Sequence, residues 1–289
     1  MHQESWTVLS MLDWATNYFN QKGIKNSRLS IEWLLAHVLE VKRLDLYLLF
    51  ERPLSSRELE QLRPLVQRRA KHEPLQYIIG ETDFFGLKLS VSNSVLIPRP
   101  ETEELVERIL RDYPKDAPVK VMDIGTGSGC IALALKHHRP DWEIWAMDTS
   151  EEALRQAQAN AKSLDLSVQW FQDDVFDTQF LRHHPELAYQ FDVVVSNPPY
   201  ILNEERSNLD AEVVNYEPEL ALFCRSTGHM YESLMGTSKQ LLKKPGGRFY
   251  FELHERYGEE VRTLYSTVGI EAKIVKDLGE KDRFIVGTL

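Results

Sequence analysis

The first 75 residues carry the spacing of hydrophobic positions that amphipathic helices require. In the stretch SIEWLLAHVLEV, apolar residues recur at i, i+3, i+4, i+7 and i+8, namely at Ile31, Leu34, Leu35, Val38 and Leu39. This spacing places them on one face of a helix. Pro53, closely followed by two serines, marks a turn before the next helical stretch, RELEQLRPLVQRRA. The pattern predicts a small helical domain over residues 1–75.

Residues 76–100 change to the pattern of a β-hairpin. LKLSVS alternates apolar and polar positions, and Gly80 and Gly86 stand where turns are needed. Two prolines then open the amphipathic stretch PRPETEELVERIL, whose early glutamates suit the positive end of a helix. We expect residues 76–100 to form a hairpin linker and a main domain to occupy residues 101–289.

Within that main domain, short apolar strands alternate with helical patterns. Seven stretches read as strands: VKVMDI, EIWAMD, SVQWFQDD, FDVVVS, GGRFYFEL, AKIVKDL and RFIVGTL. This alternation predicts an α/β fold with a doubly wound, Rossmann-like and mostly parallel sheet of seven strands. Ligands of such sheets bind outside the carboxyl ends of the strands, so candidate chemistry is sought there.

Composition adds limits on compartment and partners. No apolar run approaches the roughly 20 residues of a membrane-spanning helix, and the first residues lack the pattern of a signal peptide. The two cysteines are too few for a disulfide framework or a metal cluster. We therefore expect a cytoplasmic protein with no membrane association and no metal. Of the net charge of −10, residues 1–75 contribute +2 and the remainder −12. The negative charge of the main domain argues against binding to nucleic acid and favours a basic protein partner. A surface charged only for solubility would explain the same negative charge equally well.

A glycine-rich turn follows the first strand of the main domain. In DIGTGSG, Gly125, Gly127 and Gly129 let the backbone turn tightly and approach a ligand. Counting from Gly125, a dinucleotide fingerprint would place its third small residue at 130, where this chain has Cys130, and no triphosphate-binding loop is present. A nicotinamide oxidoreductase is therefore disfavoured.

Carboxylates follow the next two strands. Asp148 ends EIWAMD, where an acidic side chain can accept hydrogen bonds from ribose hydroxyls. Asp173 or Asp174 ends the following strand and could accept from the exocyclic amine of adenine. Each could instead cap the next helix, but several acceptors along one edge exceed what capping requires.

The fourth strand stops at Asn197-Pro198-Pro199-Tyr200. Proline has no N–H, so the two prolines offer only carbonyl acceptors on a stiff backbone. The Asn197 side-chain oxygen and the Pro198 carbonyl could accept both hydrogens of one –NH2 group, and Tyr200 could form a flat wall. Such contacts stabilise the charge that develops when a planar amide or aryl amine attacks an electrophile. A rigid strand-exit loop is the alternative interpretation.

Taken together, DIGTGSG, Asp148 and NPPY resemble S-adenosylmethionine-dependent methyltransferases that modify amino groups. The stretch EPLQYIIGETDFFGLKLSVSNSVLIPRPETEELVE, with NPPYI, NYEPELAL and KDLGEKDRFIVG, resembles the peptide chain release factor glutamine methyltransferases over nearly the whole chain. The chain departs from the family pattern at FCRSTGHMYESL and at Glu252-Leu253-His254, where the family often carries Glu-Ile-Gly or Glu-His-Gly.

The resemblance implies N5-methylation of the glutamine in the Gly-Gly-Gln loop of release factors 1 and 2, with S-adenosylmethionine as donor and a monomeric enzyme. We further expect the helical domain to recognise the release factor away from the methylated loop. The implied donor site comprises Gly125, Thr126, Gly127, Ser128, Gly129, Asp148, Asp174, Val175 and Asn197. The implied glutamine site comprises Asn197, Pro198, Pro199 and Tyr200, and of these Asn197, Pro198 and Tyr200 are the implied catalytic residues.

Two other classes of function remain to be weighed against this one. An amino methyltransferase acting on adenine N6 or guanine N2 would use the same NPPY logic on a flipped base, but should add a basic groove. The other is a ligand-binding module that has lost catalysis, and the intact Asn197, Tyr200, Asp148 and loop glycines weigh against it.

Overall fold

The computed structural model describes residues 6–177 and 180–289. Its backbone divides into two compact units. The helical unit comprises the chain up to Gly80 together with Asp210–Tyr216, and the sheet unit comprises Glu81–Leu209 and Glu217–Leu289. Within the described residues, no helix combines the length and the apolar character needed to cross a membrane.

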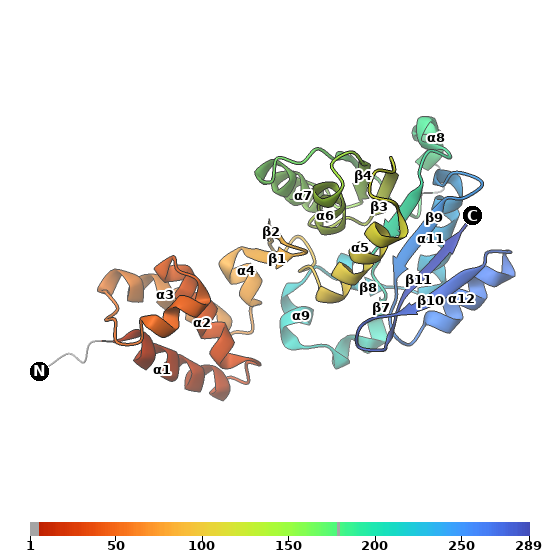
Figure 1. Ribbon diagram of the computed structural model, residues 1–289. Helices are drawn as coiled ribbons and strands as arrows, with labels where there is room; N and C mark the ends of the chain where they lie inside the picture. The colour runs from red at the N-terminus through yellow and green to blue at the C-terminus, as the bar shows by residue number, and fades with distance from the viewer. Residues whose placement is uncertain (1–5, 178–179) are drawn as a thin grey trace, which may run out of the picture. The chain divides into compact units, whose positions relative to one another are not determined.

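The helical unit is built from α1 (Val8–Gln21), α2 (Ser27–Leu39), the 3-10 helix η1 (Arg43–Leu48), α3 (Ser56–Arg69) and α4 (Leu75–Ile79) (Figure 1). Capping boxes at Thr7 and Ser55 begin α1 and α3 by satisfying backbone N–H groups that have no partner within the helix. The apolar face of α2 predicted from its spacing is buried at Ile31, Leu34 and Leu35, in a core shared with α1 and α3.

A short helix from far along the chain, α9 (Ala211–Tyr216), also belongs to the helical unit. Arg69, which is 4% exposed, pairs with Glu212 at 2.6 Å. Lys25 pairs with Asp210 at 2.7 Å, and the Tyr216 hydroxyl donates to the Lys71 carbonyl at 2.8 Å. These contacts attach residues 210–216 to helices more than 130 positions earlier in the sequence.

The sheet unit opens with the hairpin of β1 (Glu81–Phe84) and β2 (Leu87–Ser90), which begins five residues later than the linker predicted from sequence. Its main sheet has seven strands in the order β10-β11-β9-β6-β3-β4-β5, which confirms the predicted fold. Their bounds are β3 (Lys120–Ile124), β4 (Glu143–Asp148), β5 (Gln169–Gln172), β6 (Val193–Ser196), β9 (Arg248–Glu252), β10 (Ala272–Lys276) and β11 (Asp282–Thr288). The β11 strand runs antiparallel to both its neighbours, whereas β9, β6, β3, β4 and β5 are parallel.

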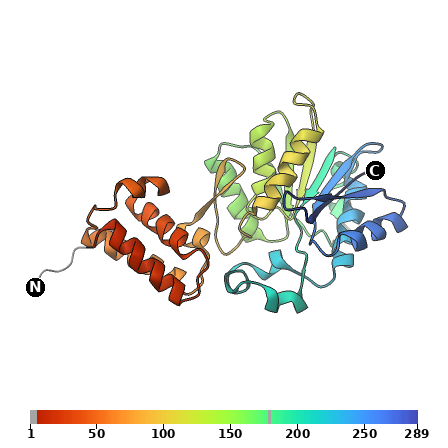
Figure 2. The ribbon, with the colours of Figure 1, turned by 60° about the horizontal axis from the view of Figure 1, so that its bottom comes forward.

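Helices cover both faces of this sheet, as Figures 1 and 2 show. One face carries α5 (Pro100–Asp112), α6 (Cys130–His138) and α7 (Glu151–Ser163), and the other carries α11 (Thr227–Leu241) and α12 (Gly258–Thr267). Alternate residues of one strand enter different cores: Val193 and Val195 pack on the α5–α6 side, and Val194 packs on the α11–α12 side. Burial on both faces explains why these strands are continuously apolar in sequence.

The parallel register brings the strand ends together at one edge. Ile124 pairs with both Met147 and Ser196, and Ser196 pairs with Phe251. The remaining elements are α8 (Phe180–His183), η2 (Pro185–Leu187), β7 (Ile201–Leu202), η3 (Asn203–Asn208), α10 (Glu219–Leu222) and β8 (Phe223–Cys224). The chain winds outward from β3 through β4 to β5 and then returns to β6, so β3 and β6 flank the topological switch point where such sheets bind ligands.

Candidate methyl-transfer site

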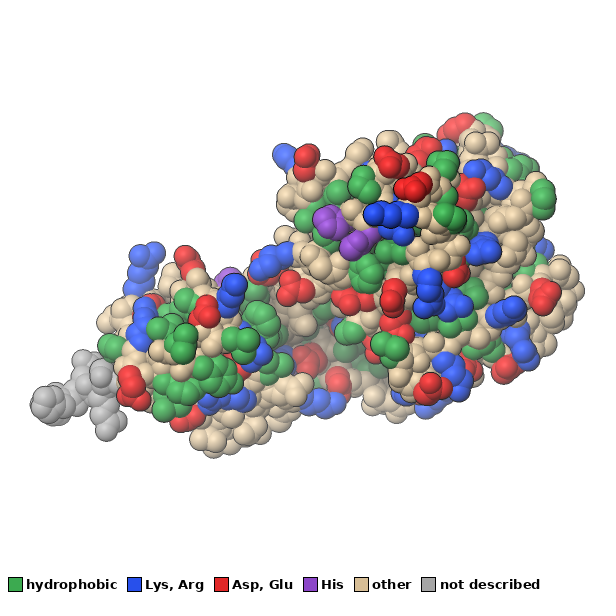
Figure 3. Space-filling model, viewed as in Figure 1, with side chains coloured by type: hydrophobic (Ala, Val, Ile, Leu, Met, Phe, Trp, Pro, Cys, Tyr) green, Lys and Arg blue, Asp and Glu red, His purple; other side chains and the backbone are tan. Residues whose placement is uncertain are grey.

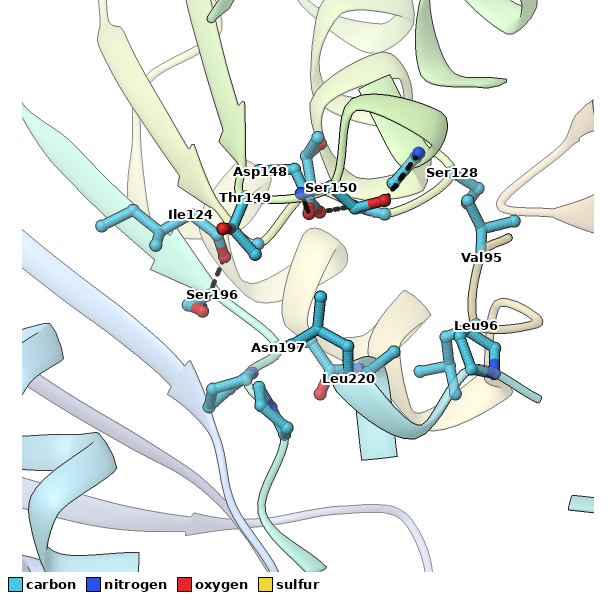
Figure 4. Close-up of a pocket in the computed structure, with 18 of the residues that line it drawn as sticks. Val95, Leu96, Ile124, Ser128, Asp148, Thr149, Ser150, Ser196, Asn197 and Leu220 are labelled. Atoms are coloured by element: carbon cyan, nitrogen blue, oxygen red, sulfur yellow. Dashed lines mark hydrogen bonds between the residues drawn. The ribbon is translucent and has the colours of Figure 1, made fainter. Parts of the chain in front are cut away.

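A cavity of about 530 Å³ lies at this edge, entirely within the sheet unit. Its lining comes from the loops after β3, β4, β5 and β6, from the segment before α5 and from the start of α10. Figure 4 shows Asp148, Thr149 and Ser150 on one side of the cavity and Asn197 with Leu220 on another. Most predicted site residues line it: Gly125, Thr126, Gly127, Ser128, Asp148, Asp174, Val175, Asn197, Pro198 and Pro199.

The glycine loop owes its shape to left-handed backbone conformations. Gly125, Gly127 and Gly129 have φ values of +72°, +55° and +82°, which side chains other than glycine rarely tolerate. Gly129 does not line the cavity. It precedes α6, and a Cβ there would lie 3.1 Å from atoms of Ala157 and Leu133. Glycine at position 129 therefore allows close packing against neighbouring side chains, whereas Gly125 and Gly127 shape the cavity wall.

Asp148 is held by the backbone of two loops. Its Oδ2 accepts from the Gly127 N–H at 2.8 Å and its Oδ1 from the Ser150 N–H at 2.9 Å. Burial raises the pKa of this carboxyl above its ordinary value, and the accepted backbone hydrogen bonds counteract that rise. Each carboxylate oxygen keeps lone pairs that can accept further hydrogen bonds from a ligand in the cavity.

Two buried oxygen atoms near the glycine loop lack a protein partner among the described residues, Asp123 Oδ1 and Ser128 Oγ. Asp123 accepts from the Thr126 hydroxyl at 2.6 Å through its other oxygen, and burial raises its pKa to about 7. Unpaired buried acceptors are costly unless a ligand satisfies them. Of these two residues, Ser128 lines the cavity, where a ligand could bond its hydroxyl, whereas Asp123 does not line it.

The loop after β5 places Asp173, Asp174 and Val175 on the cavity wall. Asp173 accepts from the Asp174 N–H at 2.7 Å, and Asp174 accepts from the Phe176 N–H at 2.9 Å. These local bonds hold the loop in a turn and leave the second oxygen of each carboxylate without a role in it. Both aspartates line the cavity and stay candidates for the adenine contact, but their surroundings differ, because Asp173 Oδ2 also lies 3.7 Å from His184 Nε2.

The Asn197-Pro198-Pro199-Tyr200 turn follows β6, and its first three residues line the cavity. The Asn197 Nδ2 donates to the Thr102 hydroxyl at 3.1 Å. Tyr200 is not among the lining residues; its hydroxyl donates to Glu252 Oε1 at 3.3 Å. Burial raises the pKa of Tyr200 well above its ordinary range, so its hydroxyl stays protonated.

Two residues at the site were missed by the sequence reasoning, Thr102 on α5 and Glu252 at the end of β9. Both are 1% exposed, and the Thr102 hydroxyl donates to Glu252 Oε2 at 2.7 Å. Burial raises the pKa of Glu252 to about 7. One sequence pattern could have indicated Glu252. It ends an apolar strand at the same sheet edge as Asn197, and a glutamate buried there requires hydrogen-bond partners.

A second buried carboxylate, Glu217, joins two segments of the cavity wall. It accepts from the Arg99 guanidinium at 2.6 Å and from the Ile97 N–H at 3.2 Å. Arg99 and Leu96 line the cavity on one side of this link, and Pro218 lines it on the other. The stretches LIPRPETE and NYEPELAL, far apart in sequence, thus form one wall.

The seven-stranded sheet, the cavity at its switch point and the NPPY turn define an S-adenosylmethionine-dependent methyltransferase. The family model "PrmC N-terminal domain" matches residues 10–80, and "Methyltransferase small domain" matches residues 102–218. The release factor glutamine methyltransferase of Geobacter sulfurreducens is 39% identical over 287 residues, covering 99% of this chain and 98% of the relative. That of Chlorobaculum tepidum is 38% identical and covers 97% of each chain. The chain belongs to the family of release factor glutamine methyltransferases.

Solved structures agree with the fold. A methyltransferase from Pyrococcus furiosus aligns with a TM-score of 0.52 at 17% identity, covering 80% of this chain and 98% of that one. The N-terminal domain of human METTL16, solved in complex with SAH, aligns with a TM-score of 0.51 at 18% identity, covering 71% of this chain and 76% of that one. At this level of identity the likeness concerns the fold alone.

Proposed function

We propose that this enzyme methylates the side-chain nitrogen, N5, of the glutamine in the Gly-Gly-Gln loop of peptide chain release factors 1 and 2. The observation that carries the proposal is the Asn197-Pro198 pair on the wall of the cavity, with the Asn197 NH2 group already bonded to Thr102. That bond leaves the Asn197 carbonyl oxygen available to accept from a substrate amide. Family membership supports release factors as the substrate class.

The donor side of the cavity is formed by the glycine loop, Asp148 and the loop at Asp174 and Val175. Bound S-adenosylmethionine supplies a methyl carbon made electrophilic by its sulfonium. Asp148 would accept from the ribose hydroxyls, and Asp174 or Asp173 from the adenine amine. Gly125 and Gly127, which carry no Cβ, let the backbone lie against the donor.

The acceptor side must activate a poor nucleophile. An amide nitrogen shares its lone pair with the carbonyl, so it attacks only when it is oriented and when the developing positive charge is stabilised. The Asn197 carbonyl oxygen and the Pro198 carbonyl would each accept one of the two N–H bonds. Preorganised acceptors of this kind contribute on the order of 3 kcal/mol each to transition-state stabilisation, and holding the two reactants together contributes further.

The chain needs no strong general base before attack. The amide proton becomes acidic only after the new nitrogen–carbon bond has formed, and it can then leave to solvent. Apolar side chains of Leu96, Pro199 and Leu220 line part of the cavity.

The helical unit offers a surface for recognising the protein substrate. Trp14 is 46% exposed and Trp33 is 39% exposed, and Trp14 stacks on Tyr18 with ring centroids 5.4 Å apart. Figure 3 shows hydrophobic side chains gathered among charged ones on this unit. Aromatic residues exposed in this way are typical of the anchors of protein interfaces. We infer that this surface binds the release factor outside the methylated loop.

Substrate identity is tested with labelled S-adenosylmethionine and three acceptors: a purified release factor, the same factor with the loop glutamine changed to alanine, and DNA or ribosomal RNA. Label should appear on the intact factor and vanish in the loop variant. Label that enters only nucleic acid would replace this proposal with a base amino methyltransferase. The Asn197→Ala enzyme should bind the donor with modestly reduced affinity and lose turnover.

Recognition is tested with Trp14→Ser and Trp33→Ser on the whole release factor. The expected result is a KM for the factor raised about 10-fold, as for the loss of one interface anchor of more than 1 kcal/mol, with kcat unchanged. Leu278→Ser is the matched control, because Leu278 is an apolar residue 88% exposed on the sheet unit. An equal effect from all three variants would remove the helical unit from this role.

A further inference from the structure

We propose that Thr102 and Glu252 are positioning residues that fix which end of the Asn197 amide faces the substrate. The inference rests on the proposed function, because it concerns the same methyl transfer. Its basis is a chain of hydrogen bonds that leads from the cavity wall into the protein interior: Asn197 Nδ2 to Thr102 Oγ1 at 3.1 Å, then Thr102 Oγ1 to Glu252 Oε2 at 2.7 Å.

The direction of these bonds follows from proton counting. A side-chain amide can rotate by 180° and exchange its oxygen for its NH2 group, which would present donors instead of an acceptor to the substrate. Thr102 has one hydroxyl hydrogen, and above a pH of about 7, where Glu252 is ionised, the carboxylate can only accept. The hydrogen is therefore committed to Glu252, and the Thr102 oxygen can only accept from Asn197. Only the NH2 end of Asn197 satisfies it.

Burial makes this arrangement selective. Thr102 and Glu252 are each 1% exposed, so water cannot supply the missing partner if the Asn197 amide is reversed. Reversal would bring the amide oxygen against a hydroxyl oxygen whose hydrogen points away. A buried acceptor facing another acceptor loses a hydrogen bond and adds repulsion.

The same carboxylate also holds the far end of the NPPY turn. The Tyr200 hydroxyl donates to Glu252 Oε1 at 3.3 Å, so the two Glu252 oxygens hold Asn197 through Thr102 and Tyr200 directly. The residues come from three elements: Thr102 from the first turn of α5, Glu252 from the end of β9, and the turn itself after β6. This gives a role to the threonine of LIPRPETE, which the donor and acceptor sites do not otherwise use.

The proposal predicts a defined kinetic pattern for variants of Thr102. Thr102→Val keeps the shape but removes the hydroxyl, and kcat on the release factor should fall about 10-fold, as expected for one lost buried hydrogen bond. Donor affinity, measured by calorimetry, should change by less than about 3-fold, because Asp148 and the glycine loop remain intact. Thr102→Ser restores the hydroxyl and should return kcat to within about 3-fold of wild type. Thr102→Ala serves if the valine variant does not fold.

Coupling between the two residues provides the decisive measurement. If Glu252 acts in part through Thr102, Glu252→Gln should lower kcat less in the Thr102→Val background than in the wild-type background, and the remaining effect is the part that acts through Tyr200. Ser238→Ala is the control, since Ser238 is a fully buried hydroxyl that bonds the Leu234 carbonyl within α11. Equal effects of Glu252→Gln in both backgrounds, or an unchanged kcat in Thr102→Val, would overturn the proposal. Wild-type enzyme that fails to label the release factor would instead overturn the proposed function.

Discussion

Replacing Glu252 by glutamine tests how burial controls this carboxyl, separately from its part in turnover. The substitution preserves side-chain size and removes ionisation. Burial raises the pKa of Glu252 from 4.5 to about 7, and Glu101 contributes to the rise; Thr102, Tyr200 and the Arg283 guanidinium counteract it. The folded protein therefore holds this proton more tightly than the unfolded chain does.

The sign of the effect on stability follows from that difference. The contribution of Glu252 favours folding fully below about pH 4.5 and is lost as the pH rises through about 7. With about 1.4 kcal/mol for each pKa unit, wild type loses on the order of 3 kcal/mol of its free energy of unfolding over this window. The Glu252→Gln variant does not have this loss. The difference in free energy of unfolding between variant and wild type should therefore grow by on the order of 3 kcal/mol as the pH rises through this window.

Urea unfolding followed by tryptophan fluorescence measures this at several pH values between 5 and 8. The quantity to compare is the difference in the free energy of unfolding between variant and wild type, because Asp123 and every other titrating group then cancel. A difference that stays constant across the range would refute the reasoning. It would mean that Glu252 is already ionised at pH 5, with its hydroxyl and guanidinium partners outweighing burial.

Three further outcomes are expected. Asp148→Asn should weaken donor binding about 10- to 100-fold in calorimetry, because a charged acceptor contributes roughly 1.5–3 kcal/mol; unchanged affinity would exclude the ribose role. In urea unfolding, Gly129→Ala should lower the free energy of unfolding by about 2 kcal/mol, because the added Cβ is crowded and the backbone has a left-handed φ. Gly125→Ala should lower it by about half as much, because an added Cβ there would have no atom within 4 Å. Glu217→Gln should raise the KM for the release factor by loosening the Arg99 side of the cavity, with donor affinity as the control that should not move.

The sequence was sufficient for the sheet and for the residues that follow its strands. Strands buried on both faces appear as short apolar runs, and parallel strands end at a common edge, so Asp148 and Asn197 could be placed together without coordinates. Residues whose role is local to one loop, such as Gly125 and Gly127, were accessible for the same reason.

The residues that the sequence did not reveal depend on long-range packing. Thr102 and Glu252 are 150 positions apart, and their contact exists only because α5 packs beside β9. Likewise, nothing in the six residues of α9 indicates that they pack with the helical unit. That attachment depends on Arg69 and Lys25 pairing with distant carboxylates, and such pairs leave no periodic pattern.

The placement of α9 determines how the protein can be dissected. The chain leaves the sheet unit after Leu209, joins the helical unit for seven residues and re-enters at Glu217, which anchors a wall of the cavity. A fragment that begins after residue 75 would lack Arg69, Lys25 and Lys71. Residues 210–216 would then have lost the ion pairs and the hydrogen bond that attach them to the helical unit. Chimaeras between relatives should therefore exchange residues 210–216 together with the amino-terminal helices, since a single splice point would separate groups that fold as one piece.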